Sequence, residues 1–220
     1  FLVGVSAHRR GESRAPICHL WELYESWVAT RVLSIVSRLL GPPTVPPRVM
    51  HINSQGAPVW RATWRVAGGG RLALYAQPEF TKRVRAHLPP MVSCTAALIP
   101  DCVLVYEVDE TFSAYGIDAK LRSTPGMTAG DLGEAASKYI WGLRRPEAPE
   151  QLALRGVTVV CSGSIAELFN PCAAKIEGVT ATPTNVHHLE CSTLALVRRL
   201  GVIAEAPEGV PPARAPVADT

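Results

Sequence analysis

Residues 98–121 read LIPDCVLVYEVDETFSAYGIDAKL, which is two apolar runs separated by a short acidic segment. The first run, Cys102–Val108, follows Pro100-Asp101, and the second, Phe112–Lys120, ends on Asp118-Ala119-Lys120. Apolar runs of this length, bounded by proline and joined by Asp109-Glu110-Thr111, are typical of two strands and a tight turn. The stretch therefore predicts an antiparallel β-hairpin with charged residues at its open end.

The charged residues of this hairpin suit attack of water on a phosphodiester. Because side chains alternate along a strand, Asp118 and Lys120 are expected on one face and Ala119 on the other. Hard cations such as Mg²⁺ take carboxylate oxygens, so Asp101 and Asp118 are candidate ligands. Lys120 would orient or deprotonate a water, or offset charge on the phosphate. The alternative is that Pro-Asp only starts a strand and Asp-Ala-Lys is a solvated edge, and both interpretations stay open.

A third carboxylate comes from the segment Leu20–Leu40, which has apolar residues at three- and four-residue spacing and precedes Gly41-Pro42. This pattern predicts an amphipathic helix. Glu25 falls within the apolar stripe and is expected to point toward the sheet that the helix covers. A buried carboxylate needs a partner. Either Glu25 joins the same metal or its water shell, or it forms an ion pair at the rim of the stripe with Arg31.

Three motifs of the chain resemble the PD-(D/E)xK nuclease superfamily, and within it the McrC-like branch of restriction nucleases. Leu23-Tyr24-Glu25-Ser26-Trp27 is similar to the Leu-Tyr-Glu-Leu-Trp signature of that branch. Ile99-Pro100-Asp101 is similar to its Arg-Pro-Asp, and Gly116–Leu121 to its Asp-Ala-Lys-Tyr. Weaker similarity lies in residues 75–80 and 178–183, so the resemblance spans roughly residues 20–185.

The resemblance implies a role for each matching residue. Asp101 and Asp118 would bind Mg²⁺, with Mn²⁺ as a substitute, the Ala119 carbonyl would be a further ligand, Lys120 would assist the water and Glu25 would support the metal. The implied function is a Mg²⁺-dependent DNA endonuclease, the cleavage subunit of a modification-dependent restriction system with a McrB-like AAA+ nucleotidase as partner. A DNA-repair nuclease or Holliday junction resolvase of the same superfamily is one alternative. A catalytically silent DNA-binding or assembly scaffold is another, although the intact motifs argue against it.

One element departs from the McrC-like pattern. The branch usually follows its core with a helix that bears a Lys-Met-His-x-Tyr-like string, whereas this chain has Ala135 where the lysine would stand and Tyr139 where the tyrosine would stand. Basic side chains on segments that flank the core are candidate phosphate contacts. The predicted DNA-binding residues are Lys82, Arg83, Lys138, Tyr139 and Arg144.

Length and composition fit one globular domain. The chain has 220 residues, of which 47% are hydrophobic and 19% charged, and a formal charge of +3 neither demands nor excludes a nucleic-acid partner. Its six cysteines form no Cys-x-x-Cys pair, which argues against a structural zinc site. No run of eighteen apolar residues occurs. We expect a cytoplasmic protein with no membrane partner, and leave a homo-oligomer open. The start at Phe1 leads us to expect a preceding segment.

The predicted fold class is α/β, a restriction-endonuclease-like core in which helices flank a mixed central β-sheet. The predicted domain is residues 1–203, with a helix at 20–40, a hairpin at 49–77, a catalytic core at 91–185, a C-terminal helix at 187–201, and a Pro-rich tail at 204–220. Further expected elements are a Pro-rich link at 41–47, helices at 78–88, 128–144 and 163–170, and strands at 95–108, 112–121, 156–161 and 176–182.

Overall fold

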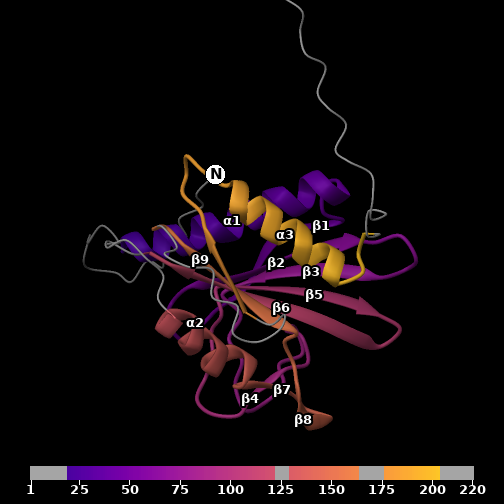
Figure 1. Ribbon diagram of the computed structural model, residues 1–220. Helices are drawn as coiled ribbons and strands as arrows, with labels where there is room; N and C mark the ends of the chain where they lie inside the picture. The colour runs from indigo at the N-terminus through magenta and orange to yellow at the C-terminus, as the bar shows by residue number, and fades with distance from the viewer. Residues whose placement is uncertain (1–18, 122–128, 164–175, 204–220) are drawn as a thin grey trace, which may run out of the picture.

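The secondary structure is seen in a computed structural model that describes residues 19–121, 129–163 and 176–203 (Figure 1). The helices are α1 (Leu20–Leu40), α2 (Ala129–Ala135), the π-helical turn η1 (Ala136–Ile140) and α3 (His187–Arg199). The strands are β1 (Val45–Ile52), β2 (Pro58–Arg65), β3 (Arg71–Ala76), β4 (Val92–Ser93), β5 (Cys102–Val108), β6 (Thr111–Lys120), β7 (Leu143–Arg145), β8 (Ala148–Leu152), β9 (Gly156–Cys161) and β10 (Ile176–Thr180). Helices and strands mix along the chain, so the α/β class is confirmed.

The centre of the molecule is a mixed sheet. Among the described residues it has seven strands in the order β1-β2-β3-β5-β6-β9-β10. Neighbours from β1 to β6 are antiparallel, whereas β6, β9 and β10 run parallel. Helices α1 and α3 cover one face, and α2, η1 and the small sheet β4-β7-β8 lie on the other (Figure 1). The predicted architecture of helices flanking a mixed central sheet is therefore confirmed.

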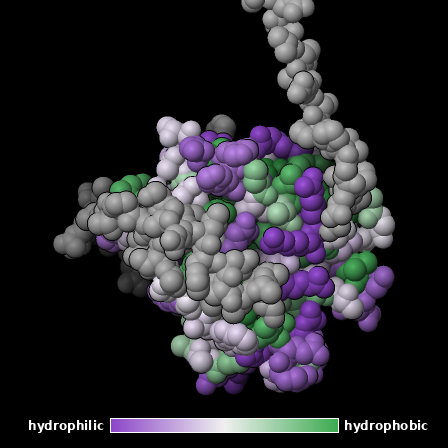
Figure 2. Space-filling view, viewed as in Figure 1, coloured by the Kyte–Doolittle hydropathy of each residue, from purple (hydrophilic) through white to green (hydrophobic). Residues whose placement is uncertain are grey.

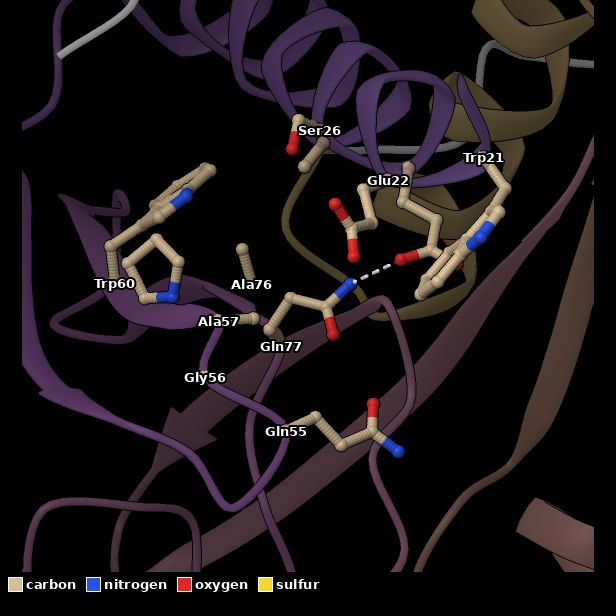
Figure 3. Close-up of a pocket in the computed structure, with 12 residues that line it drawn as sticks. Trp21, Glu22, Ser26, Gln55, Gly56, Ala57, Trp60, Ala76 and Gln77 are labelled. Atoms are coloured by element: carbon tan, nitrogen blue, oxygen red, sulfur yellow. Dashed lines mark hydrogen bonds between the residues drawn. The ribbon is translucent and has the colours of Figure 1, made fainter. Parts of the chain in front are cut away.

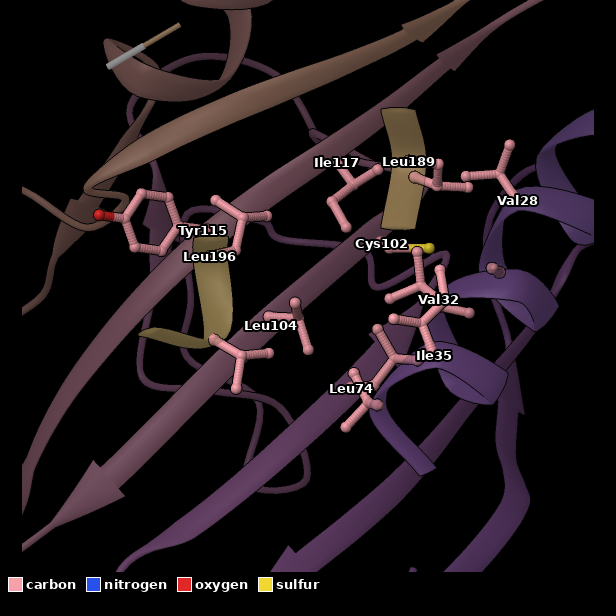
Figure 4. Packing of buried hydrophobic residues seen from close by; sticks show 14 of the residues in the cluster. Val28, Val32, Ile35, Leu74, Cys102, Leu104, Tyr115, Ile117, Leu189 and Leu196 are labelled. Atoms are coloured by element: carbon pink, nitrogen blue, oxygen red, sulfur yellow. The ribbon is translucent and has the colours of Figure 1, made fainter. Parts of the chain in front are cut away.

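Each face of the sheet has its own hydrophobic core. On the α1 and α3 side, Val32 and Leu104 are fully buried and pack with Leu196 of α3 (Figure 4). Burial of one such side chain contributes about 1.5–3 kcal/mol. Because side chains alternate along β6, Ile117 and Ala119 join this core while Asp118 projects from the opposite face, as predicted. The apolar residues of β6 thus fix the direction of its charged ones.

The predicted hairpin is formed by β5 and β6. Its two turn residues, Asp109 and Glu110, have φ angles of 46° and 63°, the left-handed conformation that a two-residue type I′ turn requires. This turn sets a register in which Cys102 pairs with Ile117. One pair further, at the open end of the hairpin, Asp101 and Asp118 stand on adjacent strand ends.

The predicted helix at 78–88 is wrong. Phe80 forms an isolated antiparallel bridge with Leu98, in which each backbone N–H donates to the other residue's carbonyl at 2.9 Å. This long-range pairing takes hydrogen bonds that a helix would need internally, and Pro78 and Pro89 restrict the segment at both ends. Residues 77–91 therefore form a loop that is tied to Leu98 through Phe80.

Four other predicted boundaries need correction. The Pro-rich link at 41–47 already contains the start of β1, so the segment at 49–77 is a three-stranded meander and not a single hairpin. The strand predicted from residue 95 begins at Cys102, after Pro100. The helix predicted for 128–144 ends at Ile140, because Leu143–Arg145 pairs with β4 and β8. The helix predicted for 163–170 and the tail at 204–220 lie outside the described residues.

The surface of the described part mixes polar and apolar groups. Figure 2 shows hydrophilic and hydrophobic side chains interspersed on one face of the molecule. Within the described residues, no helix has both the length and the apolar character needed to cross a lipid bilayer.

Candidate functional site

A polar cavity of about 160 Å³ lies at the open end of the β5–β6 hairpin, between the first turns of α1 and the π-helical turn η1. The sequence-predicted residues that line it are Glu25, Asp101, Asp118, Ala119, Lys120, Lys138 and Tyr139. The other lining residues are Gln55, Gln77, Ala97 and Ile99. Segments more than a hundred residues apart in the sequence thus meet in one cavity, which we call the carboxylate pocket.

The backbone around Pro100 explains why Asp101 reaches into the carboxylate pocket. Continuing the register of β5 and β6 places Pro100 opposite Ala119, and a proline has no N–H to donate across the ladder. The Asp101 side chain takes that place, and its Oδ2 accepts a hydrogen bond from the Ala119 N–H at 2.6 Å. In a strand, the N–H and C=O of one residue point to the same side. The Ala119 carbonyl therefore faces Asp101 too.

Asp118 is buried between a cation and a phenol. Lys120 Nζ lies 3.0 Å from Asp118 Oδ2, and Tyr139 Oη lies 3.1 Å from Asp118 Oδ1 and 3.2 Å from the Ile99 carbonyl oxygen. The single phenolic proton of Tyr139 can be donated either to Asp118 Oδ1 or to the Ile99 carbonyl oxygen at any one time. Although Asp118 Oδ2 has an ammonium nearby, it accepts no hydrogen bond of good geometry from the residues that the structure describes. The contact is an ion pair, and it leaves this oxygen with lone-pair capacity for a further ligand.

Gln77 bridges two carboxylates and was missed by the sequence analysis as a site residue. Its Nε2 donates to Glu25 Oε2 at 3.0 Å and to Asp101 Oδ1 at 3.1 Å. Its φ angle of 53° is left-handed, a conformation that glutamine seldom adopts. Its N–H donates to the Asp101 carbonyl, which ties this bend to the end of β5. The only signal in the sequence was its place in the weakly similar segment 75–80.

Glu25 does not form the predicted ion pair with Arg31 at the rim of the apolar stripe. Arg31, its predicted alternative partner, is exposed, and its guanidinium lies over the Trp27 ring at 5.9 Å from the ring centroid. Glu25 instead faces Gln77 and the carboxylate pocket. The Arg31 alternative is therefore wrong, because these side chains leave the helix in different directions.

The carboxylates of the pocket raise one another's pKa. Burial, together with the negative charge of Asp118, raises the pKa of Glu25 to about 7, although the Gln77 hydrogen bond opposes the shift. Burial and the charges of Asp118 and Glu25 also raise the pKa of Asp101 well above its usual value. Crowded, desolvated carboxylates retain protons unless a cation compensates their charge. The pocket therefore has an affinity for positive charge that Lys120 alone does not satisfy.

Lys120 stays an ammonium in this pocket. Burial on its own would lower the pKa of Lys120, but the carboxylates of Asp118, Glu134 and Asp101 together outweigh burial, and the net shift is upward. A protonated lysine donates hydrogen bonds and offsets negative charge, whereas it cannot accept a proton. Of the roles predicted for Lys120, charge compensation and orientation of a water fit this environment better than deprotonation.

The donor set matches a hard divalent cation. Within the described ranges, no three histidine, cysteine, aspartate or glutamate side chains form a ready-made metal site. Mg²⁺ does not require one, because it is commonly held by one or two carboxylates together with waters. Oxygen ligands of that kind are available here: Asp118 Oδ2, the Asp101 carboxylate and the Ala119 carbonyl.

The predicted DNA contacts are divided between the pocket and its surroundings. Lys138 is exposed at the pocket and its Nζ lies over the Tyr139 ring, 4.9 Å from the centroid. Lys82 and Arg83 are exposed on the loop after Phe80 and do not line the pocket. Arg144 lies on β7 and donates to the Ile140 carbonyl at 3.4 Å.

No family model, no curated protein and no solved structure matches this chain.

Proposed function

We propose that this chain is a Mg²⁺-dependent DNA endonuclease that hydrolyses phosphodiester bonds. The observation that carries the proposal is the convergence of Glu25, Asp101, Asp118, Ala119 and Lys120 in the carboxylate pocket. The sequence predicts each of these residues for this chemistry, and they come from α1, from the residue before β5 and from β6. A solvated strand edge, the alternative interpretation of Asp118, is disfavoured because this residue is only 3% exposed.

The proposed chemistry divides among the residues of the pocket. Asp101 and Asp118 would hold the cation with the Ala119 carbonyl, and Glu25 would support it. When bound, Mg²⁺ would polarise the phosphate and make a bound water more acidic. The Lys120 ammonium would orient the attacking water and offset the charge that builds on the phosphate. Tyr139 and Gln77 would hold Asp118 and Asp101 in place through their hydrogen bonds.

The biological setting is a finer proposal that rests on the resemblance to McrC-like nucleases. In that setting the chain is the cleavage subunit of a modification-dependent restriction system, and a McrB-like AAA+ nucleotidase is its partner. Exposed basic residues near the pocket, such as Lys138, would contact the DNA phosphates. A repair nuclease or junction resolvase would use the same pocket, so substrate preference separates these settings.

The test is cleavage of methylated and unmethylated plasmid by the wild type and by Asp118→Asn, in Mg²⁺, in Mn²⁺ and in EDTA, with and without a candidate nucleotidase. We expect metal-dependent cutting by the wild type and at least a hundredfold loss in the variant. The matched control is Asp109→Asn, the same chemical change at the far end of the same hairpin, where asparagine tolerates the left-handed conformation. Equal cutting by wild type and Asp118→Asn would refute the proposed metal site.

A further inference from the structure

A second cavity, of about 240 Å³, adjoins the carboxylate pocket along α1. It lies between the first turns of α1 and the turn that joins β1 to β2 (Figure 3). The two cavities share Glu25, Gln55 and Gln77 in their linings. The second cavity, which we call the indole groove, is therefore separated from the carboxylate pocket only by these shared side chains.

Two tryptophans form the apolar walls of the indole groove. Trp21 projects from α1 and is 48% exposed, and Trp60 projects from β2 and is half-buried. Figure 3 shows them on opposite sides of Gln77. Trp60 lies on the same strand face as Trp64, which the core buries almost completely, so Trp60 remains open because the groove begins there. Exposed indole surface beside a polar pocket suits a flat aromatic ligand.

The polar groups of the groove favour a neutral ligand over a phosphate. The described residues that line it include the carboxylates Glu22 and Glu25 but no lysine or arginine. A phosphate would therefore be repelled. The side-chain amide of Gln55 carries a donor and an acceptor, as the edges of a nucleobase do. Gln77 donates through Nε2 to Glu25 and Asp101, so it offers its amide oxygen as an acceptor.

We propose that the indole groove binds one unpaired nucleobase of the DNA strand whose phosphate enters the carboxylate pocket. This inference rests on the proposed function and adds a substrate class to it: DNA in which a nucleotide next to the cleaved bond is unstacked, in a single strand or a locally opened duplex. The base stacks on an indole wall, a contact that tolerates any base because each has a π-face. The neighbouring phosphate then lies toward Lys120 and the bound cation.

The test measures binding in EDTA, where no hydrolysis occurs, with the full chain and a labelled single-stranded oligonucleotide. The variants are Trp21→Ala and Trp60→Leu, and Trp60→Phe keeps an aromatic wall. Trp141→Ala is the matched control, since Trp141 is 57% exposed and lines neither cavity. Loss of one stacking contact predicts about 5- to 100-fold weaker binding. A strand of the same length built from abasic units should bind wild type and variants equally.

The possible outcomes separate this inference from the proposed function. Weaker binding by Trp21→Ala or Trp60→Leu, confined to the base-bearing strand, supports the groove and identifies the stacking wall. If neither variant differs from wild type, if the abasic strand shows the same loss, or if wild type does not bind the base-bearing strand, the inference is overturned. Because binding is measured without metal, a failure of plasmid cleavage would refute the nuclease proposal and leave the base-binding result standing.

Discussion

Replacing Glu25 by glutamine removes a charge that the carboxylate pocket tolerates poorly in the absence of metal. Its pKa is raised from an ordinary 4.5 to about 7, first by burial and then by the charge of Asp118. In the folded state Glu25 therefore keeps its proton over a pH range in which the unfolded chain has lost it. The resulting stability is fully present below pH 4.5 and is lost as the pH rises toward 7.

The magnitude follows from the size of the shift. A change from 4.5 to about 7 corresponds to roughly 3 kcal/mol. We halve this because Glu25 is partly open to solvent, which screens the interaction. Metal-free wild type should thus lose about 1.5 kcal/mol more stability between pH 4.5 and pH 8 than Glu25→Gln, in which this position does not titrate.

The assay is urea unfolding in EDTA at pH 4.5 and pH 8, analysed as the difference between wild type and variant so that titrating groups outside the carboxylate pocket cancel. Glu150→Gln is the control, because Glu150 is exposed on β8 and outside the carboxylate pocket. Equal pH dependence in wild type and Glu25→Gln would refute the reasoning, since Glu25 would then be ionised and satisfied without a cation.

Three further predictions concern neighbouring contacts and the core. Gln77→Leu removes the donor shared by Glu25 and Asp101 and should lower the metal-free free energy of unfolding by about 1–3 kcal/mol; an unchanged urea midpoint would contradict this. Tyr139→Phe deletes the hydroxyl beside Asp118 and should lower the cleavage rate, so equal rates in wild type and variant would rule out Tyr139 as a positioning residue. Leu104→Ala empties a fully buried site and should cost about 2–5 kcal/mol in thermal or urea unfolding, without changing the metal requirement of cleavage.

The parts of the fold that could be predicted are those specified locally. The β5–β6 hairpin follows from two alternating runs and a short turn, and its register then places Asp101 beside Asp118 without further information. The burial of Glu25 likewise follows from the helical period of Leu20–Leu40. These patterns are visible within about twenty consecutive residues.

The parts that could not be predicted depend on contacts between distant segments. Gln77 meets Glu25 across 52 residues and does so from a left-handed backbone conformation that no glutamine signals in a sequence. The Phe80–Leu98 bridge overrides local propensity in the same way. The helical period correctly predicts the direction of the Glu25 side chain. It does not predict whether Gln77 or Arg31 is the neighbour of Glu25, because that depends on which strand end lies beneath the helix.

Among the described strands, β1 lies at one margin of the central sheet, and this position has a consequence for solubility. An outermost strand presents unpaired backbone groups that can recruit a strand from another molecule and begin aggregation. In β1, Val45, Val49 and Ile52 are 43%, 48% and 52% exposed, so the strand is also apolar enough to attract such a neighbour. Pro46 and Pro47 lack N–H donors, and Arg48 adds a charge. Because of these prolines the sequence predicts a link where β1 begins, and the same prolines protect β1 from pairing with another copy of the chain.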